Sequence, residues 1–302
     1  MESIVDLMDK FNDEKACEKH LQAILWKDTE FCPHCGTVKI YHLKGGRRFR
    51  CSGCKKDFSI KTGTIFHDSK VPLRKWFLAI YLLTTHKKSM SSYQLARDIK
   101  VTQKTAYFML QRIREAVKNE NFLAPLNGTV EVDETFIGGR ERNKHASKRT
   151  EGTQGRSLKT KEPVIEMVER ETGKVKAEQI KNVDRSTVEQ KLLQHVNIGS
   201  RVISDEWRAY TKLKEFYKHE KVNHSKEEYV RGDVHTNTIE GFWAILKRSI
   251  YGVHHFVSAK HLQRYINEQT FRYNNRGDHA LMFNLLLSRI GGKKLSYREL
   301  KA

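Results

Sequence analysis

The chain has 302 residues, enough for one large domain and one or two small ones, because domains typically run to roughly 100–200 residues. This length argues against a single small module. The 56 Lys and Arg residues exceed the 36 Asp and Glu residues, and the formal net charge of +20 favours a polyanionic partner such as nucleic acid. A basic ribosome-associated factor and a protein that binds anionic membrane are the alternatives.

The N-terminus lacks the basic start and apolar stretch of a secretory signal, and no apolar run approaches the roughly 18 residues of a membrane-spanning helix. We therefore expect a soluble cytoplasmic protein with no membrane partner. Five cysteines, four of them in two CxxC pairs, fit a reducing compartment in which thiolates hold metal. The fifth, Cys17, is expected to be a half-buried small residue in a helix.

Residues 1–30 carry apolar side chains at helical spacing and are predicted to form an N-terminal helical cap. Residues 31–62 are predicted to form a zinc ribbon, because two CxxC turns with short strands between them can close on one tetrahedral Zn²⁺. A thiol-disulfide role of one pair lacks the required sequence context, whereas a purely structural ribbon stays open. The expected zinc ligands are Cys32, Cys35, Cys51 and Cys54.

Residues 72–120 carry three helical patterns that predict a helix-turn-helix. A support helix begins after Pro72, and Ser91 or Ser92 can cap a short second helix. Thr102 can cap a longer third helix after a turn of about three residues. This third helix would present four side chains to a DNA groove: Gln103, Lys104, Tyr107 and Gln111. A helical hairpin with an exposed polar face is the structural alternative.

Turn-forming residues at 122–128 mark the main domain boundary, and the apolar pattern then changes from helical to alternating. Residues 127–275 are predicted to form an α/β domain with the order strand, strand, strand, helix, strand and a closing helical region. Residues 276–302 are expected to be a C-terminal tail.

A basic loop at residues 140–161 interrupts this domain. It carries eight bases and almost no apolar side chain, so it is either a solvated charge run or a phosphate-binding element. The candidate DNA contacts within it are Arg140, Arg142, Lys144, Lys148 and Arg149.

Two carboxylates lie in or beside apolar strands, where a negative charge is unfavourable unless a cation pairs with it. They are Asp133, within a strand at 128–137, and Asp205, at the end of a strand at 201–205. A third, Glu240, lies in a predicted helix from Thr238 to Tyr251 and shares one flank of its apolar stripe with Lys247. Three such carboxylates can hold two divalent cations for in-line displacement at phosphorus, and Lys247 can hold a DNA phosphate.

Three motifs carry a family resemblance: Val132–Thr135 (VDET), Ser204–Tyr210 (SDEWRAY) and His235–Arg248 (HTNTIEGFWAILKR). They resemble the catalytic blocks of bacterial insertion-sequence transposases of the DDE superfamily, in the group that carries an N-terminal zinc ribbon. The third motif is the most specific of the three.

The resemblance implies a ribonuclease-H-like catalytic fold, dependence on Mg²⁺ or Mn²⁺, binding to terminal inverted repeats, and 3′-hydroxyl attack on target DNA. It also implies catalytic roles for Asp133, Asp205, Glu240 and Lys247, and we expect a homodimer on DNA. Asn237, one helical turn before Glu240, is an alternative or additional metal ligand; Glu240 is favoured because an anionic ligand neutralises Mg²⁺ better than an amide.

Two other functions remain to be weighed against a transposase. A DNA-binding regulator would use the ribbon and the helix-turn-helix and would need none of the three acids. A ribonuclease or Holliday-junction nuclease would share the metal site but would have no evident use for two DNA-binding modules in front of it. Terminal inverted repeats flanking the coding sequence would separate these possibilities.

Overall fold

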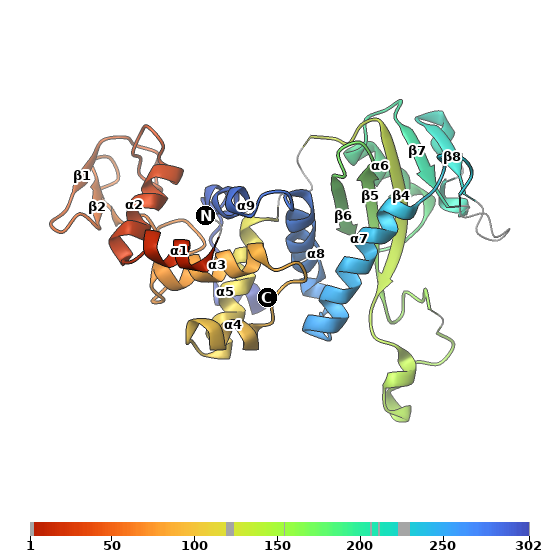
Figure 1. Ribbon diagram of the computed structural model, residues 1–302, viewed down its shortest axis with the longest axis horizontal. Helices are drawn as coiled ribbons and strands as arrows, with labels where there is room; N and C mark the ends of the chain where they lie inside the picture. Colours follow the sequence, from red (N-terminus) through yellow and green to blue (C-terminus); the bar gives the residue numbers. More distant parts are fainter. Residues whose placement is uncertain are drawn as a thin grey trace. The chain divides into compact units, whose positions relative to one another are not determined.

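The structure is a computed structural model that divides into two compact units, Met1–Lys118 with Asn275–Ala302, and Asn119–Asn274 (Figure 1). The predicted boundary at 122–128 lies close to this division, although residues 119–123 are outside the described part of the chain. Residue Glu206 of the second motif also lies outside it. The described residues are 3–118, 124–153, 155–205, 207–210, 212–222 and 230–301.

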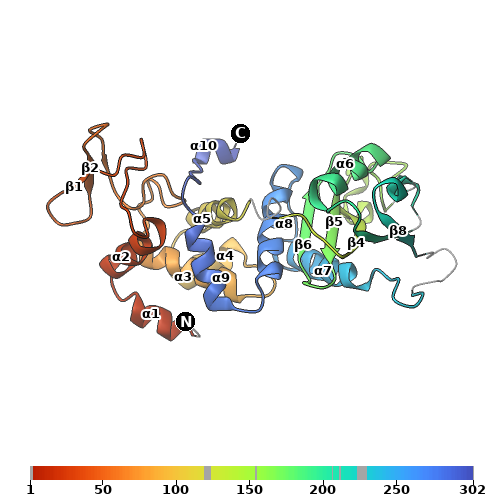
Figure 2. The same ribbon diagram turned by 90° about the horizontal axis from the view of Figure 1, so that it is seen from above.

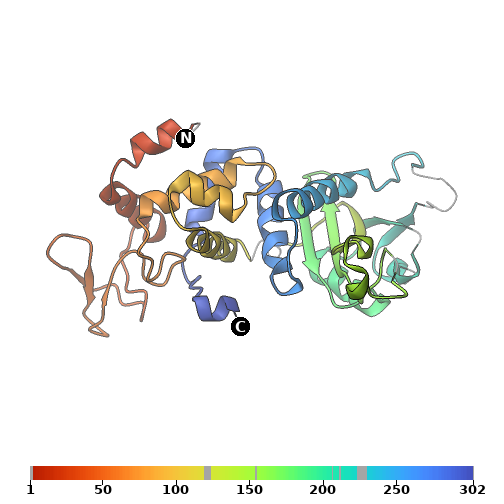
Figure 3. The same ribbon diagram turned by 90° about the horizontal axis from the view of Figure 1, so that it is seen from below.

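The first unit is a helical body with a small three-stranded ribbon. The ribbon strands are antiparallel in the order β1-β2-β3 and are found in orange beside the red helices in Figure 3. The strands are β1 (Ile40–His42), β2 (Phe49–Cys51) and β3 (Asp57–Phe58). The helices that precede and follow them are α1 (Ile4–Lys10), α2 (Glu14–Leu25), α3 (Leu73–Thr85), α4 (Ser92–Ile99) and α5 (Gln103–Ala116).

The C-terminal segment belongs to the core of this first unit. It forms α9 (His279–Ser288) and α10 (Tyr297–Lys301), and α9 packs against α2 and α3. The ring of Phe283 lies 5.7 Å from that of Phe77. Residues from both ends of the chain therefore form one apolar cluster. The tail expected at 276–302 is therefore a packed helical segment, because its apolar side chains are buried against helices from the other end of the chain.

The second unit is built on one mixed five-stranded sheet with the order β6-β5-β4-β7-β8. The pairs β4–β5 and β5–β6 are antiparallel, whereas β4–β7 and β7–β8 are parallel. The strands are β4 (Thr129–Ile137), β5 (Glu162–Glu169), β6 (Val175–Gln179), β7 (Arg201–Ser204) and β8 (Lys218–Lys221). Sequence analysis missed β8, whose polar sequence KHEK gives no apolar alternation at the edge of the sheet.

Helices cover both faces of this sheet, as Figure 2 shows. Helix α6 (Arg185–His195), capped by Asp184 as expected, packs on one face through Val188 and Leu192. Helices α7 (Asn237–Lys247) and α8 (Ala259–Asn274) pack on the other. Because side chains alternate along a strand, the even-numbered residues of β4 face α6 and the odd-numbered ones face α7.

The helix predicted from Thr238 to Tyr251 changes its hydrogen-bonding pattern before its end. After α7, the chain widens into a π-helix, Arg248–His254, a feature that has no periodic signature in the sequence. Among the described residues, no helix has both the length and the apolar character to span a membrane.

Candidate active site

Asp133, in the middle of β4, and Asp205, directly after β7, lie close enough for their charges to interact. Strand β4 pairs in parallel with β7 up to Glu131 opposite Ile203, so the chain leaves β7 beside the part of β4 that carries Asp133. Burial raises the pKa of Asp133, and the negative charge of Asp205 raises it further. Two carboxylates that are partly desolvated and repel each other are stabilised when a divalent cation lies between them. The sequence-predicted pair is thus brought together.

Helix α7 reaches this pair through Trp243. The indole Nε1 donates a hydrogen bond to Oδ2 of Asp133 at 3.0 Å, which opposes the rise in its pKa. Trp243 is 4% exposed, in the apolar stripe that binds α7 to the sheet. The indole therefore holds one carboxylate oxygen of Asp133 in a defined direction.

Glu240 and Asn237 lie in the first turn of α7, and both side chains are exposed. Asp133, Asp205 and Glu240 do not form a cluster of possible metal ligands; among the described residues, only the four ribbon cysteines do. Glu240 differs from Lys247, with which it was predicted to share one flank of the apolar stripe, because its side chain faces solvent. Lys247, the last residue of α7, is half-buried.

Glu166 is a further acid at this position that sequence analysis missed. It is the cross-strand partner of Asp133 on β5 and therefore points to the same face of the sheet. Its side chain is fully buried, and neither carboxylate oxygen has a hydrogen-bond partner among the described residues. Burial, with the charges of Asp133 and Glu131, raises its pKa well above the usual range. An acid inside the apolar run of β5 is the sequence signal that could have marked it.

Glu134 lies next to Asp133 in the chain but points to the opposite face. Its carboxylate accepts a hydrogen bond from the hydroxyl of Tyr210, which belongs to the cluster under α6. Burial raises the pKa of Glu134 to about 8, so its side chain is mostly uncharged at neutral pH. This environment separates the role of Glu134 from that of Asp133.

The basic loop is anchored beside the end of the α7 region. The hydroxyl of Tyr251, in the π-helix, accepts from the backbone N–H of Gly138 at 3.1 Å and donates to its carbonyl at 3.2 Å. Within the loop, Lys144 donates to Glu141 at 2.6 Å, and Arg149 donates to the carbonyl oxygens of Lys144 and Arg142.

Two of the predicted DNA contacts thus also organise the loop itself. All five predicted DNA contacts in the loop have exposed side chains: Arg140, Arg142, Lys144, Lys148 and Arg149.

The four ribbon cysteines form a cluster whose ligand atoms lie within 4.8 Å of one another, which fits a structural zinc ion. The pairs Cys35–Cys51 and Cys32–Cys54 have Sγ–Sγ distances of 3.5 and 3.8 Å. Backbone N–H groups of the knuckles point at the sulfur atoms, as that of Gly53 does at Cys51. Cys17 is fully buried in α2, so it was correctly kept apart from this set.

The helices of the predicted helix-turn-helix are present as a hairpin, with Ser91 and Thr102 as their N-caps. Lys104 is exposed and Tyr107 is half-buried. Gln103 donates to the hydroxyl of Ser92 at 2.8 Å and so joins the two helices. Gln111 is fully buried, which makes its expected contact with DNA wrong. It lies on the face of α5 that packs into the unit.

Comparisons with known proteins agree with this two-part organisation. Residues 125–274 match the ISXO2-like transposase domain, and residues 12–57 match the transposase zinc-ribbon domain. The uncharacterized protein in transposable element ISH50 of Halobacterium salinarum is 33% identical over 270 residues, which cover 85% of this chain and 89% of that protein.

Solved structures give weaker similarities, each at 14% identity. The simian T-cell lymphotropic virus intasome in complex with PP2A regulatory subunit B56 gamma is matched over 64% of this chain and 68% of its own, with a TM-score of 0.32. A pre-cleavage Mos1 transpososome is matched over 73% of this chain and 79% of its own, with a TM-score of 0.29. Such scores support no argument by themselves.

The relative in ISH50 is matched along most of both chains. In this chain the match to the zinc-ribbon family precedes the match to the transposase-domain family. Both domain descriptions are those of transposases. The chain therefore belongs to the insertion-sequence transposases of the DDE superfamily that carry an N-terminal zinc ribbon.

Proposed function

We propose that this transposase cuts DNA at the ends of its insertion sequence and joins the 3′ ends to target DNA, using Asp133, Asp205 and Glu240. The observation that carries the proposal is that Asp133 on β4 and Asp205 directly after the parallel strand β7 lie close enough for the charge of Asp205 to raise the pKa of Asp133. A regulator that only binds DNA would have no need for this carboxylate pair.

A ribonuclease-H-like fold for residues 127–275 is supported by the topology of the sheet. In chain order the strands lie 3-2-1-4-5, with the second strand antiparallel to its neighbours and helices on both faces. This arrangement places the C-terminal end of β7 beside the middle of β4, where Asp133 lies. The helix that follows the last strand, α7, carries Glu240.

Mg²⁺ or Mn²⁺ would be held by the carboxylates of Asp133, Asp205 and Glu240, and it would activate the attacking hydroxyl and stabilise the leaving oxygen. Hard oxygen donors and the raised pKa of Asp133 fit such an ion. Trp243 orients Asp133 through its indole N–H. Lys247 would hold a DNA phosphate near the reacting strand.

Glu240 fits the third position better than Asn237 does. With about 100° between successive helical residues, Glu240 lies about 60° around α7 from Trp243, whereas Asn237 lies about 120° away. Trp243 marks the side of the helix that meets Asp133. Rotation of the exposed Glu240 side chain toward that side would complete the site.

DNA would be recognised by the first unit and by the basic loop. Lys104 and Tyr107, with Gln103 as support, would read the terminal inverted repeats from α5, while the ribbon and residues 140–161 would contact phosphates. Because an insertion sequence has two ends, we expect two copies of the chain to assemble on DNA.

The test is strand cleavage of a duplex that carries the terminal repeat, by the full-length protein with Mg²⁺ or Mn²⁺. Asp133→Asn and Asp205→Asn should each lower the cleavage rate by at least about a hundredfold, because a neutral amide cannot replace an anionic metal ligand. Their affinity for the duplex, measured by gel shift, should stay within about twofold of the wild type. Normal cleavage by both variants would reject the catalytic proposal.

Glu134→Gln is the matched control, because it changes the adjacent acid on the same strand. Its side chain points to the other face and is mostly uncharged at neutral pH, so glutamine is close to an isostere. We expect it to cleave. In the same assay, a dead Asn237→Ala beside an active Glu240→Gln would assign the third ligand to Asn237.

A further inference from the structure

The first turn of α7 is bound to strand β4 by a buried carboxylate. Glu131 lies two residues before Asp133, on the same face, and its side chain is fully buried. Its Oε2 accepts a hydrogen bond from the backbone N–H of Ile239 at 3.0 Å. That N–H is one of those at a helix N-terminus without a partner inside the helix, where a negative charge is stabilised. Glu131 thus fixes the beginning of α7 next to Asp133.

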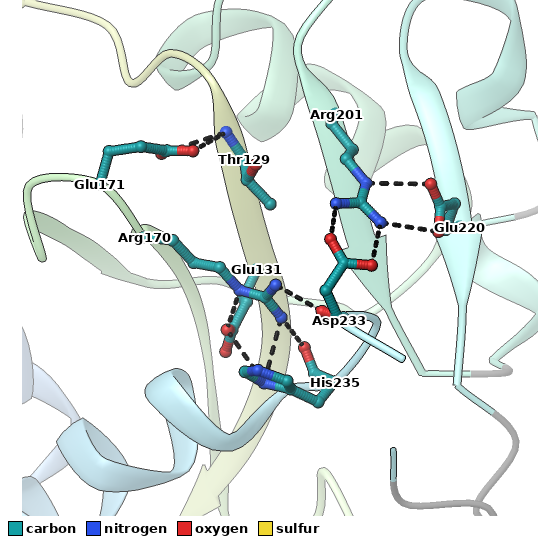
Figure 4. A network of polar contacts seen from close by, with 8 residues as sticks. All are labelled: Thr129, Glu131, Arg170, Glu171, Arg201, Glu220, Asp233 and His235. Carbon is teal, nitrogen blue, oxygen red and sulfur yellow. Dashed lines mark hydrogen bonds and ion pairs between the residues drawn. The ribbon is translucent and has the colours of Figure 1, made fainter. Parts of the chain in front are cut away.

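The second part of this connection is the guanidinium of Arg170, which follows β5. Its Nε donates to Oε1 of Glu131 at 2.6 Å. One terminal nitrogen donates to the carbonyl of Asp233 at 2.6 Å, and the other to the carbonyl of His235 at 2.5 Å. The three nitrogens therefore bind the carboxylate and two carbonyls of the segment that leads into α7 (Figure 4).

We propose that Glu131 and Arg170 form a positioning joint that sets the place of the first turn of α7, and with it Glu240, relative to Asp133. The proposal rests on the proposed function, because it concerns how the third carboxylate reaches the other two. Glu131 and Arg170 touch no substrate in this account. They act through the backbone that they hold.

The chemistry of the joint requires both the charge and the shape of these side chains. A guanidinium presents donors in a planar fork that can reach three acceptors at once, whereas a lysine ammonium is a compact point charge on a flexible stem. Arg170→Lys should therefore keep the charge beside Glu131 but release Asp233 or His235. Glu131→Gln is isosteric and weakens both the pairing with Arg170 and the stabilisation of the α7 N-terminus.

Arg201 provides a matched control in the same region. Its guanidinium binds Glu220 of the neighbouring strand, with Nε to Oε1 at 2.9 Å, and the side chain of Asp233. Figure 4 shows it on the far side of Asp233 from Glu131. Like Arg170, Arg201 binds acidic residues, but it contacts neither Glu131 nor the backbone of His235. Arg201→Lys therefore makes the same substitution outside the joint. It should report the general effect of loosening this network.

The experiment measures the single-turnover cleavage rate of a terminal-repeat duplex against Mg²⁺ concentration, with duplex affinity and melting temperature for each full-length variant. Arg170→Lys and Glu131→Gln should each lower the rate by about tenfold to a hundredfold and raise the Mg²⁺ concentration for half-maximal rate. Duplex affinity should stay at the wild-type value. Arg201→Lys should leave the Mg²⁺ dependence as in the wild type.

The double variant Arg170→Lys, Glu131→Gln should be no worse than the more impaired single variant, because both changes break the same joint. Wild-type Mg²⁺ dependence in folded Glu131→Gln would overturn the proposal even if Arg170→Lys does not fold. The proposal would also be overturned if Arg170→Lys and Glu131→Gln lost no more cleavage rate than Arg201→Lys does. It would fail likewise if the losses of the two single variants added up in the double variant. Asp133→Asn in the same assay separates the two claims: if it cleaves, the proposed function fails, and if it is dead while the joint variants are normal, only the joint fails.

Discussion

At the scale of single residues, the acids of the sheet differ in their surroundings, although the sequence alone shows each of them only as a carboxylate. Asp133 has a like charge beside it and an indole N–H on one oxygen, Glu134 hydrogen-bonds Tyr210 on the other face, and Glu166 is buried without a partner in the described structure. The proposed metal site uses Asp133 together with Asp205, whose charge raises the pKa of Asp133.

Trp243→Phe tests the orientation of Asp133 at this scale. Phenylalanine keeps most of the apolar volume but removes the N–H donor, and a hydrogen bond to a charged group contributes about 1.5–3 kcal/mol. We expect cleavage to fall by about tenfold with unchanged duplex affinity, measured in parallel by single-turnover kinetics and gel shift. Cleavage at the wild-type rate would mean that Asp133 is oriented without the indole.

At the scale of elements, α6 is attached to β6 by a buried ion pair that makes stability depend on pH. Burial would raise the pKa of Glu178, but hydrogen bonds from His195 and Lys191 outweigh it and lower the pKa to about 2. This lowered pKa stabilises the fold above the ordinary carboxylate range near pH 4.5, and the stabilisation is lost as the pH falls toward 2.

Glu178→Gln should therefore destabilise the protein by about 1–3 kcal/mol at pH 7 and by less at pH 3. Urea unfolding of both proteins at the two pH values measures the difference. An equal difference at both values would show that the charge of Glu178 does not couple to folding.

The hairpin of α4 and α5 is tested through the side chains that it exposes. Lys104→Ala and Tyr107→Ala should weaken binding to terminal-repeat DNA more than binding to random duplex, because contacts from a recognition helix specify sequence whereas phosphate contacts only position the protein. Competition gel shifts at fixed salt give the two affinities. Equal losses on both DNAs would make the hairpin a structural element.

At the scale of the whole molecule, sequence patterns predicted what local chemistry determines and missed what depends on distant partners. The CxxC turns and the capped helices follow from local periodicity and spacing, whereas Asp133 and Asp205 are linked by the family resemblance of their motifs. Strand β8 has no apolar alternation, and α9 is recognised as core only because it packs on α2 and α3. Glu131 and Arg170 are far apart in the chain, so no local pattern links them.

The division into two units predicts that loss of zinc acts locally. Cys51→Ser with Cys54→Ser should remove one equivalent of zinc and unfold the ribbon, which is too small to bury a stable core without metal. Elemental analysis and hydrogen exchange by mass spectrometry would follow both effects. Unchanged zinc content would exclude these ligands, and loss of protection throughout Asn119–Asn274 would contradict the local effect.

The most direct test of the central claim is whether Asp205 touches the metal ion that cleavage requires. In Asp205→Cys a thiolate replaces the carboxylate, and a thiolate is a poor ligand for the hard Mg²⁺ but a better one for Mn²⁺. We predict that the wild type cleaves terminal-repeat DNA with either ion, that Asp205→Cys cleaves only with Mn²⁺, and that Asp205→Asn cleaves with neither. Cleavage by Asp205→Cys at the wild-type rate with Mg²⁺, or its complete inactivity with both ions while DNA binding persists, would contradict the account.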